Sequence, residues 1–266
     1  MKTFTINLLV ISCCVVMLFS CQPKNEYKLV WVDEFDYSGL PDSTKWSFDT
    51  EGNASGWGNN EAQYYTDSDL RNAFVSDGTL KIVALKDSMG GKAYTSARLV
   101  SREKGDWLYG KFEMRAKLPV GRGTWPAFWM LSTDWEYGGW PESGEIDIME
   151  QVGYAPDTIV GSAHTKSYNH SIGTHKNAMV FCPTANSEFH TYGLEWEPAE
   201  YRVYLDRKPY FTFKNEHTDF KAWPYNKRFH ILMNLAIGGN WGGKHGIDDA
   251  IFPATYEIDY VKVWQK

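Results

Sequence analysis

The stretch KFEMRAKL, residues 111–118, alternates charged and apolar side chains without a break. Alternate residues of an extended strand lie on the same face, so the apolar set would point into a core and the charged set into solvent. The inward set is Phe112, Met114, Ala116 and Leu118. This pattern predicts a β-strand that is buried on one side.

The same period recurs away from this stretch. TLKIVALK, residues 79–86, also looks extended, and EYRVYLDRKPYFTF, residues 200–213, alternates again. A turn from Asp206 to Pro209 divides the second of these, which is the signature of a β-hairpin. Glycines and prolines recur at short intervals elsewhere, and no long stretch has helical periodicity. We therefore predict an all-β sandwich.

The composition excludes several classes of protein. The 266 residues are 43% hydrophobic and 23% charged, unlike a disordered, fibrous or polytopic membrane chain. The net charge is -6, and no basic run is present that could follow phosphates, so nucleic acid is not an expected partner. The chain has 12 Trp, 16 Tyr and 14 Phe, so we expect some rings to face a ligand. We expect a monomer.

The N-terminus indicates export. Lys2 is followed by an apolar run over residues 4–19, as in the core of a signal peptide. The run ends in LFSC, which resembles a bacterial lipobox, so we predict a lipoprotein signal over residues 1–20 and lipidation of Cys21. The alternative is an uncleaved membrane anchor, although the run is shorter than the about 20 residues that a spanning helix needs.

This interpretation sets the domain organisation and the location. Residues 21–28 would form a lipid-anchored tether, and residues 29–266 would form one catalytic domain. The protein would be an exported bacterial lipoprotein at the outer membrane, at the cell surface or in the periplasm, attached to the membrane only through its lipid. Cys182 would then be the one cysteine of the mature domain, so we expect no internal disulfide and a buried, inert thiol there.

The stretch GEIDIMEQVG, residues 144–153, carries three acids next to apolar residues. Clustered acids in such surroundings are costly unless they are compensated. In a regular strand Glu145 and Asp147 share one face, whereas Glu150 falls on the apolar side. A regular strand therefore cannot bring all three carboxyl groups into one cleft.

A β-bulge would resolve this conflict. If Ile148 and Met149 together oppose one residue of the neighbouring strand, Glu150 returns to the face of the other two acids. Two carboxyl groups roughly 5 to 5.5 Å apart perform retaining hydrolysis of a glycosidic bond. The alternative is an acidic stripe on a solvated strand.

The preceding sequence favours the catalytic interpretation. GRGTWPAFWML, residues 121–131, places Trp125 and Trp129 on one face of an extended strand, where they are suited to stacking on sugar rings. Phe128 and Met130 would point the other way, into the core.

Together these stretches resemble glycoside hydrolase family 16, whose signature is an E-x-D-x-x-E strand preceded by a WPAFWM-type segment. The resemblance continues through VWVDEFDY, GWGNNEAQYYT, YTSARLVS, SAHT, FHTYGLEWEP, MNLAIGGNWGG and YEIDYVKVWQ. It implies a β-jelly-roll of two curved antiparallel sheets with a concave substrate cleft. It also implies that Glu145 is the nucleophile, Asp147 the assisting acid and Glu150 the acid/base.

The substrate class also follows from the resemblance. The extra residue Met149 is similar to the bulged members of the family, which include laminarinases, agarases and carrageenases, and the motifs around it look most like laminarinases. The implied activity is a retaining endo-β-1,3-glucanase, with mixed-linkage β-1,3-1,4-glucan as a further substrate. The alternatives are a hydrolase of agarose, porphyran or carrageenan and a non-catalytic surface glycan-binding protein. A sulfated substrate would favour cations in the cleft, where the sequence offers Arg98 and Arg122.

The resemblance implies further sugar-binding residues. Asn60 and Arg98 match positions that hydrogen-bond sugars on the non-reducing side, and a salt bridge to a nearby acid is the alternative for Arg98. Trp125 and Trp129 would form the stacking platform, and Trp241 would form a further wall.

Histidines and metals complete the predicted site. His164, in SAHT, resembles a residue near the leaving group that supports Glu150. Zinc is not expected at His164, His170 and His175, because neither a helical HExxH nor cysteine ligands accompany them.

The resemblance also implies one structural calcium, with no cofactor required for catalysis. The matching ligand positions are Glu34, Gly78 and Asp259, and backbone carbonyls with one carboxylate would suit Ca²⁺. The alternative is a hydrogen bond from a terminal strand to Asp259.

Overall fold

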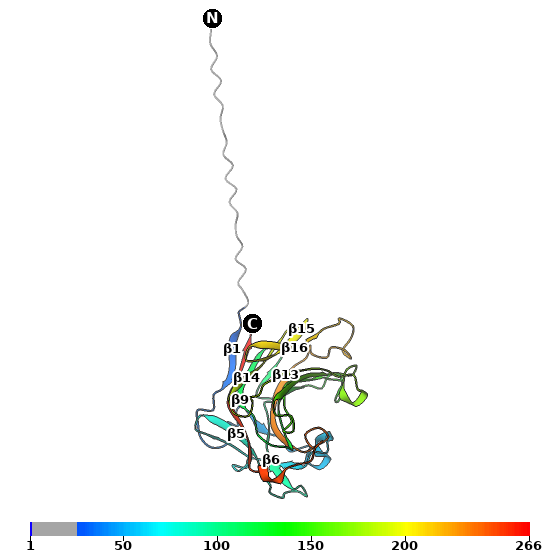
Figure 1. Ribbon diagram of the computed structural model, residues 1–266. Helices are drawn as coiled ribbons and strands as arrows, with labels where there is room; N and C mark the ends of the chain where they lie inside the picture. The colour runs from blue at the N-terminus through cyan, green and yellow to red at the C-terminus, as the bar shows by residue number, and fades with distance from the viewer. Residues whose placement is uncertain (2–25) are drawn as a thin grey trace.

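Two curved antiparallel sheets make up most of the chain that the structure describes, which is Met1 and residues 26–266. In this computed structural model the sheets pack face to face as a jelly roll, and one of them curves around a concave space (Figure 1). We call that one the inner sheet and the other the outer sheet. The predicted fold class is confirmed.

Both sheets contain eight strands. The outer sheet has the order β16 (Lys208–Lys214), β15 (Glu200–Leu205), β14 (His190–Trp196), β9 (Gly110–Lys117), β18 (Ala254–Gln265), β5 (Thr79–Ala84) and β4 (Ala73–Ser76), with β1 (Lys28–Asp33) paired to β18. The inner sheet has the order β13 (Lys176–Phe181), β12 (Thr158–His164), β11 (Glu145–Glu150), β10 (Thr124–Ser132), β17 (Phe229–Ile237), β7 (Arg98–Val100) and β2 (Ser47–Phe48), with β8 (Asp106–Trp107) paired to β17. A short parallel pair, β3 (Gln63–Tyr65) and β6 (Tyr94–Ser96), and the 3-10 turns η1 (Asn53–Gly58), η2 (His170–Ile172) and η3 (Asp249–Ile251) complete the elements.

The strands follow the alternation of the sequence. The four apolar residues predicted to point inward from residues 111–118 are at most 2% exposed. The predicted hairpin is formed by β15 and β16, but its turn is shorter than expected and consists of Asp206 and Arg207. Both residues have positive φ, 47° and 64°. Two consecutive left-handed residues match the twist of the flanking strands, so two residues suffice to reverse the chain.

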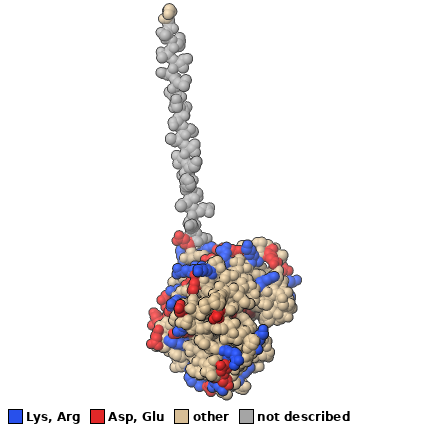
Figure 2. Space-filling view, viewed as in Figure 1, with Lys and Arg blue, Asp and Glu red and all other residues tan. Residues whose placement is uncertain are grey.

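The core lies between the two sheets and is rich in rings, with Trp46, Trp196 and Tyr256 at most 2% exposed. Cys182 is buried and free, as predicted. On the face seen in Figure 2, basic and acidic side chains are interspersed. None of the helical segments within the described residues has the length and apolar character needed to cross a bilayer. The predicted signal and Cys21 lie outside the described residues.

Candidate active site

The centre of the inner sheet contains the predicted bulge. On the β12 side, Asp147 pairs with Ser162 and Glu150 with Val160, so two residues of β11 oppose one residue of β12. On the β10 side the register also shifts within β11. The two residues that form the bulge, Ile148 and Met149, are both fully buried in the core. The bulge therefore turns Glu150 to the face of Glu145 and Asp147, as the sequence predicts.

A glycine precedes the bulged strand. Gly144 has a φ of 85°, and a Cβ there would lie 2.7 Å from a side-chain carbon of Pro224. Because other residues rarely adopt this backbone conformation and have no space here, glycine is needed where the chain enters β11.

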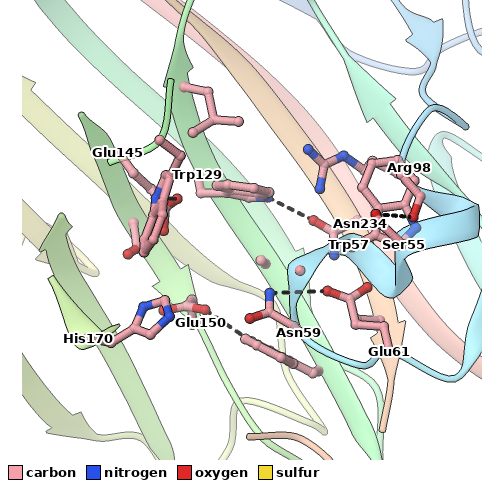
Figure 3. Close-up of a pocket in the computed structure, with 18 of the residues that line it drawn as sticks. Ser55, Trp57, Asn59, Glu61, Arg98, Trp129, Glu145, Glu150, His170 and Asn234 are labelled. Carbon is pink, nitrogen blue, oxygen red and sulfur yellow. Dashed lines mark hydrogen bonds between the residues drawn. The ribbon is translucent and has the colours of Figure 1, made fainter. Parts of the chain in front are cut away.

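The three acids line one open cleft of about 380 Å³, within the size range of small-ligand sites. Figure 3 shows two of them, Glu145 and Glu150. Asp147 is 2% exposed, and Glu145 and Glu150 are partly buried. Such burial disfavours the charged form of each carboxyl group, so the neighbours decide which of them ionises.

Glu150 lies at the end of β11. The indole Nε1 of Trp125 donates a hydrogen bond to Glu150 Oε1 at 3.0 Å. Burial, and then the nearby carboxylates of Asp147 and Glu145, hold the pKa of Glu150 well above its usual range. A carboxyl group in this environment keeps its proton at neutral pH and can act as a general acid.

Glu145 lies at the start of β11. Trp140 Nε1 donates to Glu145 Oε2 at 2.8 Å, and His164 Nε2 lies 3.7 Å from Glu145 Oε1. Burial and the charge of Asp147 raise the pKa of Glu145 to about 8, while His164 and the Trp140 hydrogen bond act in the opposite direction. These two groups stabilise the ionised carboxylate that a nucleophile requires.

His164 is buried against two of the acids. Its Nε2 lies 3.3 Å from Asp147 Oδ2, and burial alone would lower its pKa. The carboxylates, led by Glu145, outweigh burial and raise the pKa of His164 to about 9. The imidazole is therefore cationic at neutral pH. This cation lies against Glu145 and Asp147, whereas the family resemblance predicted that His164 supports Glu150.

Arg98 lines the cleft and also forms an ion pair. Its Nε forms an ion pair with Asp49 Oδ2 at 3.0 Å, which is the predicted alternative. It nevertheless lines the cleft, where its guanidinium lies between the rings of Trp57 and Trp129, 4.3 and 4.8 Å from their centroids (Figure 3). Trp129 also donates from Nε1 to Asn234 Oδ1 at 2.7 Å, so its ring is fixed from two sides.

Three of the residues predicted to bind substrate, Asn60, His164 and Trp241, do not line the cleft. Asn60 is exposed and donates to Asn240 Oδ1 at 2.8 Å, while its neighbour Asn59 lines the cleft instead. Asn60 has a φ of 55°, and this left-handed step turns consecutive side chains in different directions. Trp241 packs edge-on against Trp125, with 5.5 Å between the ring centroids.

Other residues of the cleft were missed by the sequence analysis. Trp57, Trp135, Trp140, Asn234 and His170 line the cleft as well. Trp57 lies in the quoted motif GWGNNEAQYYT, which is the signal that would have found it. Asn234 likewise lies in the quoted motif MNLAIGGNWGG. The others come from loops and from η2, and only the tertiary structure brings them to the acids.

Three histidines gather beside β11. The ring of His164 lies 5.3 Å from that of His170 and 5.7 Å from that of His175. The described side chains that could share a metal ion are instead Glu145, Asp147 and His164, whose ligand atoms lie within 4.8 Å of one another. His164 and the two acids attract one another as opposite charges, which explains why they lie together without a bound metal ion.

The residues proposed for calcium are otherwise engaged. Asp259 forms an ion pair with Arg115, and Glu34 Oε1 lies 2.7 Å from Lys262 Nζ. Gly78 occupies the turn between β4 and β5 with a φ of 75°. A guanidinium that already neutralises the one carboxylate ligand would repel Ca²⁺, so these residues as placed do not fit the ion.

Comparison with known proteins identifies the family. The sequence profile described as Glycosyl hydrolases family 16 matches residues 60–262. The chain is 50% identical over 246 residues to a beta-glucanase of Rhodothermus marinus, which spans 90% of this chain and 85% of that protein. Its structure is similar to that of a laminarinase from Rhodothermus marinus, with a TM-score of 0.88, 49% identity and coverage of 91% of this chain and 98% of that chain. It is also similar to a non-specific endo-beta-1,3(4)-glucanase of family 16, co-crystallised with 1,3-beta-D-cellotriosyl-glucose, with a TM-score of 0.88, 44% identity and coverage of 91% and 95%. The chain therefore belongs to glycoside hydrolase family 16.

Proposed function

We propose that this protein is a retaining, endo-acting hydrolase of laminarin-type β-1,3-glucan, with mixed-linkage β-1,3-1,4-glucan as a further substrate. The observation that carries the proposal is the bulge in β11, which turns Glu150 into the cleft that also holds Glu145. The laminarinase and the endo-beta-1,3(4)-glucanase to which the chain is similar support the choice of glucan.

The first chemical step uses both glutamates. Glu150 donates its proton to the glycosidic oxygen while the Glu145 carboxylate attacks the anomeric carbon. The bond from that carbon to the glycosidic oxygen breaks, and the leaving sugar departs with a hydroxyl group. The raised pKa of Glu150 keeps the required proton in place, and the His164 cation stabilises the charge of Glu145 and Asp147 before attack.

The second step returns the enzyme to its starting state. Glu150, now a carboxylate, takes a proton from water as the water attacks the anomeric carbon, and the bond to Glu145 breaks. Two displacements at one carbon retain its configuration. The two glutamates perform every proton transfer and displacement, so no cofactor is required.

The charge of the cleft favours a neutral substrate over a sulfated galactan. Among the described residues that line the cleft, Arg98 is the one Lys or Arg side chain, and Asp49 already neutralises it. Arg122, the other cation considered from the sequence, is not part of this lining. A sulfate group would therefore find no free cation in this lining, whereas the tryptophans suit the C–H faces of glucose.

A panel of purified polysaccharides tests the proposal. We expect release of reducing sugar from laminarin and from mixed-linkage β-glucan, and none from agarose, porphyran or carrageenan. NMR of the first product should show retained anomeric configuration. Binding of laminarin without release would instead identify a glycan-binding protein, and release from a galactan alone would identify the other hydrolase class.

We also propose that the protein is an exported lipoprotein, anchored through Cys21, that acts as a monomer. The support is the LFSC sequence, together with β1, which begins at Lys28, the last residue of the proposed tether. Expression in a bacterial host with a labelled fatty acid should label the parent and leave Cys21→Ala unlabelled. Equal labelling of both would contradict the anchor, and light scattering of the purified domain would test the monomer.

A further inference from the structure

A row of directly paired residues crosses the inner sheet. Each residue in the row is the register partner of the next, so the six side chains share the concave face of the sheet. The row consists of Arg98, Asn234, Ala127, Glu150, Val160 and Met179. Neighbouring strands are about 4.8 Å apart, so the row is about 24 Å long and Met179 lies about 10 Å from the strand of Glu150.

The two arms of this row differ. On one side of Glu150, the residues Ala127, Asn234 and Arg98 belong to the lining of the cleft. On the other side the row passes over β12 and ends at Met179 on β13, the edge strand of the inner sheet (Figure 1). The second arm therefore extends the same concave face beyond the cleft.

Large apolar side chains lie exposed at the end of the second arm. Met179 is 65% exposed and Phe181, two residues further along the same face of β13, is 71% exposed. Exposed apolar side chains on an edge strand promote unwanted association unless they serve a partner. Asn177, also on this face and exposed, adds a polar amide next to Met179. Apolar surface with an adjacent amide matches a sugar, which presents both C–H faces and hydroxyl groups.

We propose that Met179 and Phe181 form a binding surface for the glucosyl units on the leaving-group side of the cleaved bond. This inference rests on the proposed function, because an endo-acting enzyme holds its polymer on both sides of that bond. Glu150, which protonates the leaving oxygen, lies between the two arms. Arg98, with Trp57 and Trp129 against its guanidinium, occupies the arm assigned to the non-reducing part of the chain, so the reducing part lies over β12 and β13.

Kinetics on two substrates test this surface with the variants Met179→Ser and Phe181→Ser. Laminarihexaose occupies both arms, whereas 4-nitrophenyl β-laminaritrioside has only a nitrophenyl group on the leaving side. We expect kcat/KM for laminarihexaose to fall roughly three- to tenfold in each variant, the effect of losing one weak ring or thioether contact. The value for the nitrophenyl substrate should stay at that of the parent.

The control is Leu29→Ser, since Leu29 is 51% exposed and lies on β1 of the outer sheet. It should leave both substrates unchanged. Unchanged cleavage of laminarihexaose in the β13 variants, or an equal loss on both substrates, would overturn the inference. So would a parent dimer, measured by light scattering, that Phe181→Ser converts to a monomer with unchanged kinetics, because a second copy would then be the occupant. If the parent releases nothing from laminarin, the proposed function itself fails.

Discussion

Each end of β11 carries a glutamate that lies in the cleft, but the two glutamates have different neighbours. Glu150 receives one neutral hydrogen bond, from Trp125, and its strongest charged neighbours are carboxylates. Glu145 receives a similar hydrogen bond from Trp140 and also lies 3.7 Å from the cationic His164. The pKa of Glu145 is raised to about 8, while that of Glu150 is raised well above its usual range.

This difference supports the proposed roles of the two glutamates. Both lose solvation in the cleft, so burial alone cannot distinguish them. The cation on the β12 side favours the ionised form of Glu145, and the carboxylates around Glu150 favour its protonated form. A double displacement needs one acid and one carboxylate, and Glu145, with a pKa of about 8, supplies the carboxylate as the pH rises toward that value.

The largest effect is expected from removing each carboxyl group in turn. Glu145→Ser should lose at least about a thousandfold in turnover on every substrate, since no covalent intermediate forms. Glu150→Ser should lose a similar amount on laminarin but still release dinitrophenol from a dinitrophenyl laminaribioside, because that leaving group needs no proton.

Azide distinguishes the two variants further. It should give the inverted glycosyl azide with Glu145→Ser and the retained one with Glu150→Ser, as read by NMR. The exposed acid Glu136, changed to Ser, is the control and should keep the parent rate. Azide products in the opposite assignment would reverse the roles of the two glutamates.

Trp140→Phe should change the pKa of Glu145 and leave Glu150 unaffected. In the parent, the Trp140 hydrogen bond favours the charged carboxylate of Glu145. Because the variant loses this bond, the pKa of Glu145 should rise by about one unit. The acidic limb of the kcat/KM profile should then move to higher pH, and the rate at neutral pH should fall about tenfold. An acidic limb that stays in place would show that this indole does not tune the nucleophile.

Trp125→Phe is the matched change at the Glu150 end, with a smaller expected effect at neutral pH. Its hydrogen bond also lowers the pKa of its partner, so removal should raise the pKa of Glu150 further. Glu150 already holds its proton at neutral pH, so only the basic limb should move, toward higher pH. A shift of the acidic limb in this variant would contradict the assignment of the acid.

The His164 cation should also affect how the free energy of unfolding depends on pH. Its pKa is raised from 6.5 to about 9 on folding, so its stabilisation is fully present below pH 6.5 and is lost as the pH rises through about 9. Glu145, whose pKa is raised to about 8, changes stability in the same direction. Urea unfolding should show a free energy that falls over this range, with a smaller fall in His164→Gln. Equal pH slopes in both proteins would contradict the cationic state of His164.

The smallest effect is expected from calcium and chelators at the predicted calcium site, away from β11. Arg115 already neutralises Asp259, so a chelator should change Tm by less than about 2 °C, the shift produced by roughly 1 kcal/mol in a chain of this size. Differential scanning calorimetry with EDTA and with added CaCl₂ measures this. A larger rise in Tm with calcium would restore the predicted site at Glu34, Gly78 and Asp259.

The inner sheet also shows where prediction from the sequence stops. The bulge was predictable because Ile148 and Met149 are both apolar and must both be buried, which leaves one way to place Glu150 beside the other acids. The cleft face of Trp125 and Trp129 followed from the period of a strand. Asn60 could not be separated from Asn59, because the left-handed residues around η1 have no simple period.

Local alternation by itself determined the strands and the face that each one buries, because side-chain direction in a strand depends only on the backbone period. The common face of the three acids needed one interruption of that period, the bulge at Ile148 and Met149. Which charges meet across strands was decided by the tertiary structure. His164 faces Glu145 because β12 returns antiparallel to β11 in one register, and Met179 joins the row of Glu150 through the same pairing. Register depends on the hydrogen bonds and packing of whole sheets, which no short stretch of sequence contains.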